Sequence, residues 1–269
     1  MRTFLFLLFM AILSSTSEAA LPKIMVEDAW PPFAFKKQGQ PAGLSVDLVQ
    51  EAFRLVDEKP QLVQVPYPRC LALTAAGKFP ACFNSAHSSE MNKDFLFPKE
   101  SLFKSRGLIV TNLSSSARLK IERVTDLEGR SVALPTGFPF GPQFDENKKI
   151  KKIFTASDYN SLRMLKANRV AFIAIDEFVY YYLVKENPEF RNFSVLLLLS
   201  EEDIFVHFAK NEEGRLLLKK FEVGLAKLKK SPRYQEILES WIGPIKKDQE
   251  QILTSLPEGS ATLKSSLTP

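Results

Sequence analysis

The chain has 269 residues, of which 45% are hydrophobic, and its formal net charge at pH 7 is +5. This length suffices for one large domain or two smaller ones with buried cores. The basic residues form only short clusters, at 148–152 and 219–230, and no basic block alternates with aromatic residues. The composition therefore argues against nucleic-acid binding and indicates solvated basic faces with a mild attraction for anions.

The first 19 residues have the pattern of a signal peptide. A charged start precedes an apolar run at 4–13, and small or polar residues follow at 14–19. Ser17 and Ala19 fit the small-x-small rule, which predicts cleavage next to Ala19. The alternative is an uncleaved anchor, but the apolar run is too short to span a bilayer comfortably. We therefore expect an exported protein that resides in the periplasm.

Two cysteines, Cys70 and Cys82, lie close together in the sequence. An oxidising compartment permits a disulfide between them. The span between them contains a predicted helix and a predicted strand, and sequence does not show the separation of the two Cα atoms. A disulfide and two separate buried thiols therefore both stay open. With only two histidines and no Cys-x-x-Cys pair, the sequence predicts no metal site and no cofactor.

An aromatic-proline turn follows the first predicted strand, at 21–27. Pro31 and Pro32 fix two successive φ angles, so the strand cannot continue through them. The turn holds Trp30 and Phe33 at the C-terminal end of the strand. An aromatic turn at that place can form one wall of a ligand crevice, although the same two side chains could instead be core residues.

A polar hairpin and an amphipathic helix follow the turn. Ser45 is the predicted N-cap of this helix, and Asp47 lies in its first turn, where a negative charge suits the helix dipole. A strand at 61–65, a helix at 69–78 and a strand at 80–86 complete a β-α-β-α-β pattern, which predicts a parallel sheet with right-handed crossovers. The last of these strands carries polar residues to its C-terminal end, namely Asn84, Ser85 and His87.

A second α/β unit is predicted after the serine-rich segment at 112–120, where the composition changes. Its expected elements are strands at 131–135, 153–156, 171–175 and 195–200 and helices within 142–150, at 158–166 and at 178–186. A strand at 204–209 returns to the first unit and precedes two helices that end at Gly243. The predicted domains are thus lobe 1 (20–111 and 204–243), lobe 2 (112–203) and a tail (244–269). This order predicts an α/β fold of two lobes, each with a mixed, mostly parallel sheet flanked by helices, joined by two hinge crossings.

Several motifs together resemble the family 3 bacterial solute-binding proteins, over residues 24–243. They are W-P-P-F at 30–33, G-L-S-V-D-L at 43–48, Y-P-R-C-L at 67–71, the segments 124–137 and 171–177, and the closing helix with its Trp-x-Gly end at 241–243. The resemblance implies a type II periplasmic-binding-protein fold that captures a small polar or zwitterionic, amino-acid-like solute. It also implies an inner-membrane ABC permease as partner, and we expect a monomer.

The sequence departs from this family where the ligand carboxylate is expected to bind. The resemblance places a carboxylate-binding arginine at Met91, which cannot bind a carboxylate. Either Arg69 supplies the charge or the ligand is not an α-amino acid. Asp176 aligns with the residue that accepts the ligand ammonium, although an aspartate at a strand end can equally cap the next helix.

The expected lobe 2 side of the crevice is the loop 136–141. Its backbone N–H groups at a helix start suit an anion, but Phe138 and Phe140 stand where the family often has hydroxyl or acidic side chains. Aromatic residues would enrich the pocket unless they are core residues: Trp30, Phe33, Tyr67, Phe83, Phe138 and Tyr159. The candidate ligand-binding residues are Trp30, Phe33, Arg69, Asn84, Ser85, His87, Gly137, Phe138 and Asp176.

Two other functions remain open from sequence. A solute-loaded protein could signal to a membrane receptor instead of delivering its ligand to a permease. A dehydratase-like enzyme would need an acid–base pair in the crevice, for which His87 and Glu90 are the nearest candidates. A lone histidine at a strand end is more often structural, so we expect no catalysis.

Overall fold

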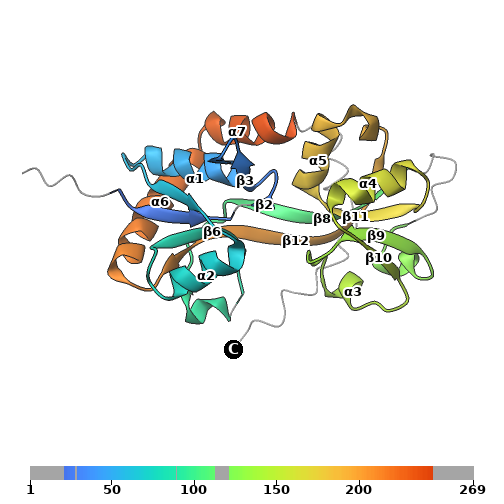
Figure 1. Cartoon of the computed structure of the whole chain (residues 1–269), viewed down its shortest axis with the longest axis horizontal. Coiled ribbons are helices and arrows are strands. Elements are labelled where there is room, and N and C mark those ends of the chain that lie inside the picture. Colours follow the sequence, from blue (N-terminus) through green and yellow to red (C-terminus); the bar gives the residue numbers. More distant parts are fainter. Residues whose placement is uncertain (1–20, 28, 89, 113–120, 245–269) are drawn as a thin grey trace, which may run out of the picture.

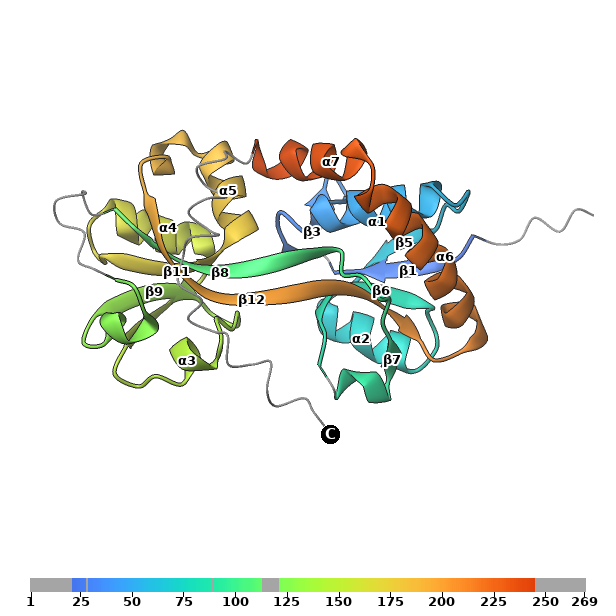
Figure 2. The same cartoon turned by 180° about the vertical axis from the view of Figure 1, so that it is seen from behind.

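The computed structural model describes residues 21–27, 29–88, 90–112 and 121–244. The predicted signal peptide, nearly all of the serine-rich segment and the predicted tail beyond 244 lie outside these residues. Figures 1 and 2 show two groups of helices and strands side by side, joined by two long strands. Among the helices of the described residues, none combines the length and the apolar character that a membrane crossing requires.

Within the described residues, nine strands form one sheet, in which eight follow the order β10-β9-β11-β8-β12-β6-β1-β5 and β7 pairs with β12. The lobe 1 strands are β1 (Lys23–Val26), β5 (Gln61–Gln64), β6 (Ala81–Ala86) and β7 (Phe95–Leu96). The lobe 2 strands are β9 (Ser131–Pro135), β10 (Lys151–Thr155) and β11 (Phe172–Asp176). The joining strands are β8 (Phe103–Thr111) and β12 (Ser194–Ala209). Strand β1 lies between β5 and β6 and is parallel to both, which confirms the predicted parallel sheet.

Helices cover both faces of this sheet (Figure 1). In lobe 1 they are α1 (Leu44–Arg54), α2 (Tyr67–Ala75), α6 (Glu212–Lys229) and α7 (Pro232–Ile242). In lobe 2 they are α3 (Pro142–Asp145), α4 (Asp158–Lys166) and α5 (Glu177–Glu186). Short 3-10 turns are η1 (Met91–Lys93), η3 (Val124–Leu127) and η4 (Pro188–Phe190). The structure thus has the predicted mixed α/β architecture of two lobes.

The connection between the lobes differs from the prediction. The expected separate strands at 195–200 and 204–209 are one continuous strand, β12, which pairs with β8 up to Ile204 and with β6 from Ile204 onward. Strand β8 pairs with β11 from Gly107 to Thr111, so these residues already belong to the lobe 2 side of the sheet. The chain therefore crosses between the lobes within two paired strands, β8 and β12. Because β8 and β12 form one antiparallel hydrogen-bonded pair, their pairing continues across the crossing between the lobes.

The start of α1 corrects a second prediction. Ser45 lies inside the helix, where it is buried, and the N-cap is Gly43 with φ 138°. The preceding turn replaces a side-chain cap, because the N–H groups of Leu44 and Ser45 donate to backbone carbonyls of the proline turn at 2.8 and 3.0 Å. A Cβ atom at position 43 would lie 2.2 Å from the carbonyl oxygen of Phe33. Only glycine allows this close approach.

The cysteine question is decided by the packing of α2 on β6. Cys70 on the helix and Cys82 on the strand form a disulfide, with their Cα atoms 6.0 Å apart. This separation is ordinary for a disulfide. The bond ties α2 to the strand that carries Asn84.

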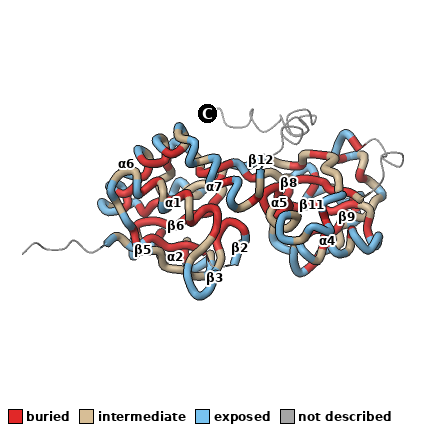
Figure 3. Tube along the Cα trace, turned by 90° about the horizontal axis from the view of Figure 1, so that it is seen from above, coloured by how far each residue is buried: buried red, intermediate tan, exposed pale blue. Residues whose placement is uncertain are grey.

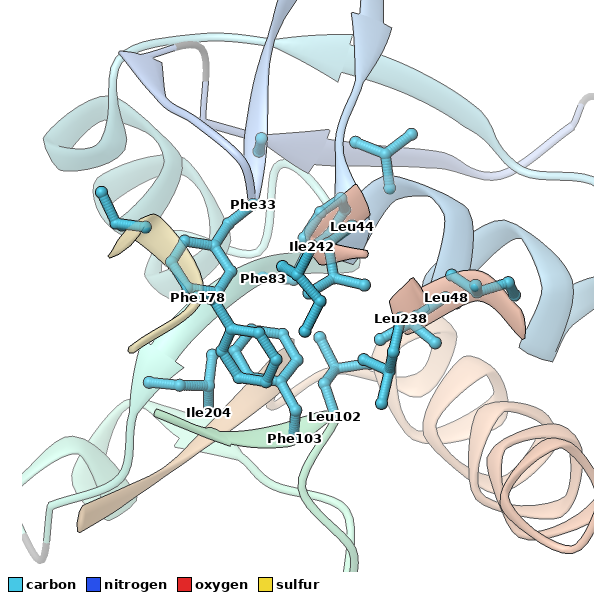
Figure 4. Packing of buried hydrophobic residues seen from close by; sticks show 14 of the residues in the cluster. Phe33, Leu44, Leu48, Phe83, Leu102, Phe103, Phe178, Ile204, Leu238 and Ile242 are labelled. Carbon is cyan, nitrogen blue, oxygen red and sulfur yellow. The ribbon is translucent and has the colours of Figure 1, made fainter. Parts of the chain in front are cut away.

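The buried residues continue from one lobe into the other, as the red segments of Figure 3 show. Where the lobes meet, Phe33 stacks on Phe103 at 5.1 Å between ring centroids. Phe178, at the start of α5, meets Phe33 at 5.8 Å and Phe103 at 5.3 Å (Figure 4). These three rings fill the junction between the aromatic turn, β8 and α5. Aromatic pairs in such geometry add to the stabilisation from apolar burial.

Candidate functional site

A cleft of about 580 Å³ lies between the two lobes. Its lobe 1 lining is Glu27, Ala29, Trp30, Pro31, Tyr67 and Asn84. Its lobe 2 lining is Pro135, Thr136, Gly137, Phe138, Ala156, Ser157, Asp158, Tyr159, Val179, Tyr182 and Leu183. A recess of about 180 Å³ adjoins it and shares Trp30, Asn84 and Phe138. The cleft has the dimensions of a small-molecule site, and its lining comes from both lobes.

The aromatic wall of the cleft comes from both lobes. Trp30 ends the short strand β2 (Ala29–Trp30), which pairs with β3 (Ala34–Lys37), and β4 (Gln40–Ala42) completes this second sheet. The buried ring of Phe33 supports the indole from behind, at 4.3 Å between centroids. Across the cleft, the ring of Phe138 lies 6.0 Å from the indole. Two half-buried aromatic rings, tilted by 49° to each other, thus meet from opposite lobes.

Asn84 is the most unusual residue of the lining. It has φ 74° and interrupts the pairing of β6 with β12, where the register shifts. A bulge of this kind re-aims a side chain, and asparagine tolerates the left-handed conformation better than most residues. Asn84 is only 5% exposed, yet neither polar atom of its side chain has a hydrogen-bond partner among the described residues. Buried amides are normally paired, so this one calls for a functional explanation.

Lobe 2 presents the N-terminus of α4 to the cleft. Ser157 is the N-cap and accepts a hydrogen bond from the N–H of Asn160, so Asp158 is the first helical residue. The Asp158 carboxylate accepts no hydrogen bond from any other residue that the structure describes. Burial, together with the negative charge of Asp176, raises the pKa of Asp158 to about 7.

The cleft is acidic. Two carboxylates line it, from Glu27 and Asp158, and no lysine, arginine or histidine is among the described residues of its lining. Arg106 lies behind it on β8, where its guanidinium contacts Glu177 at 3.4 Å and Glu201 at 2.8 Å. Arg106 is therefore paired with two carboxylates of the protein. The described lining therefore offers no cation for a ligand carboxylate.

Four of the nine predicted site residues line the cleft together, namely Trp30, Asn84, Gly137 and Phe138. Phe33 does not, because it is fully buried at the junction of the lobes. Phe83, considered with the pocket aromatics, is equally buried. Tyr67 and Tyr159 do line it. Periodicity could not separate these cases, because strand and turn residues on either side of a sheet look alike in sequence.

Ser85 and Asp176 are occupied by structural hydrogen bonds. The buried Ser85 hydroxyl contacts the Tyr67 hydroxyl at 2.8 Å and Nδ1 of His207 at 2.7 Å. Asp176 is 2% exposed, accepts a hydrogen bond from the Ser105 hydroxyl and caps α5 through the N–H of Val179 at 3.0 Å. Neither lines the cleft. Of the two roles considered for Asp176, ligand contact and helix capping, the structure shows helix capping.

Arg69 and His87 lie outside the lining as well. Arg69 is exposed near the start of α2, and His87 is exposed with its Nε2 atom 2.9 Å from the side-chain oxygen of Asn92. Met91, at the start of η1, also does not line the cleft. Arg69 thus lies outside the described lining, so in this structure it places no charge in the cleft. The structure instead adds carboxylates that sequence reasoning did not select. Asp158 carried one visible signal, because it directly follows a capping serine at the end of a strand.

A sequence profile of the bacterial extracellular solute-binding proteins, family 3, matches residues 23–244. The chain belongs to this family. No curated protein has a significantly matching sequence.

Solved structures of the same architecture agree with the fold of this family 3 protein. The L-cystine solute receptor of Neisseria gonorrhoeae is 16% identical with a TM-score of 0.68, covering 83% of this chain and 93% of that one. The arginine-, lysine-, histidine-binding protein ArtJ from Geobacillus stearothermophilus is 19% identical with a TM-score of 0.61, covering 86% and 98%. A histidine kinase sensor domain is 20% identical with a TM-score of 0.63, covering 83% and 96%. At such identities the likeness establishes the two-lobed fold alone.

The described residues hold one serine–histidine contact, and it is structural. Ser85 and His207 are both fully buried, and burial lowers the pKa of His207 to about 3, so the imidazole is neutral. The Nε2 atom of His207 has no hydrogen-bond partner in the described part of the chain, so nothing orients the ring as a base. No substrate could reach this pair without opening the core. The family and its neighbours are binding proteins, and this site agrees with binding.

Proposed function

We propose that the protein captures a small polar solute of amino-acid size in the cleft between its lobes. One observation carries the proposal. Asn84 is buried, conformationally strained and unpaired among the described residues, and it lines the cleft beside Trp30. Strain of this kind costs about 1–3 kcal/mol and persists at functional sites. A ligand that bonds to the amide removes the cost of leaving it unpaired.

The two joining strands support closure around such a ligand. β8 and β12 run between the lobes side by side (Figure 2). The residues that line the cleft come from both lobes. A hinge of this type closes when the ligand contacts both lobes better in the closed state. We propose that the exported protein works in the periplasm as a monomer and delivers its solute to an inner-membrane ABC permease.

Sensing is the second candidate. The fold is shared with a histidine kinase sensor domain, so ligand-induced closure could be read by a membrane receptor instead of a permease. An adjacent gene for a permease and an ATPase would favour uptake. An adjacent kinase gene would favour sensing.

The proposal is tested with the purified mature chain and a panel of amino acids, amines, organic acids and peptides. Binding to the folded state alone raises the midpoint of thermal unfolding by mass action. Small-angle scattering should then show a smaller radius of gyration with the same compound, because the lobes close. A panel that neither stabilises nor compacts the protein would contradict solute binding. Conversion of a bound compound, followed by NMR, would instead indicate an enzyme.

A further inference from the structure

Among the described residues that line the cleft and its recess, the charged side chains are all carboxylates. Glu27 and Asp158 line the main volume, and Glu202 lines the adjoining recess. On β8, which runs behind the cleft, Lys104 is paired, since it contacts Glu201 at 2.9 Å and Asp203 at 3.4 Å. Arg106 is held by its own two carboxylates. A ligand carboxylate entering here would meet the negative charge of Asp158, and the described lining offers it no lysine, arginine or histidine.

The N-terminus of α4 at the cleft does not make the cleft attractive to a ligand carboxylate. Backbone N–H groups at the start of a helix attract anions, and the start of α4 faces the cleft. Asp158 is the first residue of that helix and already places a carboxylate there. Its pKa of about 7 reflects burial and the neighbouring negative charge of Asp176. A second carboxylate would add repulsion, whereas a cation would relieve it.

The remaining lining suits a cation in two further ways. The rings of Trp30 and Phe138 stand 6.0 Å apart, with Tyr67, Tyr159 and Tyr182 also in the lining. The faces of such rings attract ammonium, guanidinium and quaternary ammonium groups. Independently, the amide oxygen of Asn84 is a buried acceptor without a partner among the described residues. An ammonium or guanidinium N–H group is a donor of the kind this oxygen lacks.

We infer that the ligand of this cleft is an organic cation without a carboxylate, such as a diamine, a guanidino amine or a quaternary amine. The inference rests on the proposed function and narrows its solute class. It assigns Asp158 to the ligand's positive charge, the rings of Trp30 and Phe138 to its cationic or apolar surface, and Asn84 to a hydrogen bond. It also removes any need for the arginine that Met91 replaces.

Decarboxylated pairs isolate the carboxylate as the only difference between two probes. Isothermal titration calorimetry on the mature protein at pH 8 compares cadaverine with lysine and agmatine with arginine. We expect at least one amine to bind about tenfold or more tightly than its amino acid. Choline distinguishes ring contacts from hydrogen bonding, because it is cationic but has no N–H group. Tight binding of choline or of a primary amine would each support the cation assignment.

Two variants test the role of Asp158. D158N keeps the size of the side chain and removes its charge, and we expect it to weaken binding of the best cation about tenfold. E212Q is the matched control, because Glu212 is also the first residue of a helix, α6, but does not line the cleft. It should bind like the unmodified protein. Equal affinity of D158N and the unmodified protein would overturn the assignment.

The outcomes separate this inference from the proposed function. Lysine or arginine binding as tightly as its amine, or succinate binding more tightly than any amine, overturns the cation class while leaving solute capture intact. If no compound of the full panel binds, solute capture fails and the cation class fails with it.

Proton release gives a further readout, because a cation beside Asp158 lowers its pKa. Titrations at pH 7 in two buffers of different ionisation enthalpy should therefore give different observed heats.

Discussion

At the scale of single residues, Asn84 combines three properties that rarely coincide. It has a left-handed backbone, lies at a strand irregularity and keeps a buried amide without a partner in the described structure. Each property alone lowers stability, and a core residue under no other constraint would avoid all three. This coincidence at the cleft is the reason for our proposal that Asn84 serves ligand binding.

Replacing Asn84 by glycine should separate stability from binding. Glycine adopts φ 74° without strain, and the unpaired buried amide disappears, so the unfolding midpoint should stay equal or rise. Affinity for cadaverine should fall about tenfold, measured by calorimetry. Asn168→Gly is the control, because Asn168 also has a left-handed backbone (φ 54°) but is exposed and does not line the cleft. Unchanged affinity in N84G would remove Asn84 from the site.

At the scale of elements, the turn before α1 determines where Trp30 stands. The carbonyls of the proline turn bind the first N–H groups of α1, and Trp30 rests on Phe33 within the same segment. Helix α7 locks α1 from outside, since the indole N–H of Trp241 donates to Asp47 at 2.7 Å. The aromatic wall of the cleft is therefore rigid because backbone and core hold it, not because of contacts on its exposed side.

Gly43→Ala should destabilise the protein strongly, by about 1–3 kcal/mol from backbone strain plus the cost of a steric clash. The added methyl would lie 2.2 Å from the Phe33 carbonyl oxygen, so the turn must move. Gly39→Ala is the matched control, because its φ of 79° is also positive but its Cβ would meet nothing within 4 Å. Its loss should be limited to about 1–2 kcal/mol. Urea denaturation measures both, and equal losses in the two variants would contradict the proposed role of the close approach.

At the scale of the whole molecule, buried carboxylates gather where the lobes meet. Burial raises the pKa of Asp158 to about 7, that of Glu177 to about 7 and that of Asp176 to about 6. Two neighbours act on the pKa of Glu177 in opposite directions. The positive charge of Arg106 lowers it, and the negative charge of Glu201 raises it. His207 acts in the opposite sense, because burial lowers its pKa to about 3. Acidic groups held near one another without a ligand make the free protein sensitive to pH.

The free energy of unfolding should fall as the pH rises from about 5 to 7.5 in the absence of ligand. The three carboxyls bind protons more tightly when folded, so their stabilisation is present at low pH and is lost as pH passes 6 to 7. His207 opposes this only below its unfolded pKa of about 6.5. Denaturant titrations at pH 5, 6.5 and 7.5 measure the trend, and D158N should show a shallower fall. Stability that rises over this range would show that these carboxyls ionise freely in the folded protein.

Much of the architecture follows from local sequence, because periodicity and capping act within one element. The order of strands and helices, the bounds of α4 and the parallel packing of β1, β5 and β6 could all be predicted. The family motifs lie in these same elements.

Only the tertiary structure decided that Phe33 is core, that Asp176 caps a helix and that β12 is one strand. The acidic lining of the cleft was also decided by the tertiary structure, since Glu27 and Asp158 are distant in sequence and both line the cleft only when the two lobes face each other. Charge and burial at a site depend on residues from several elements, and no pattern within one element reports them.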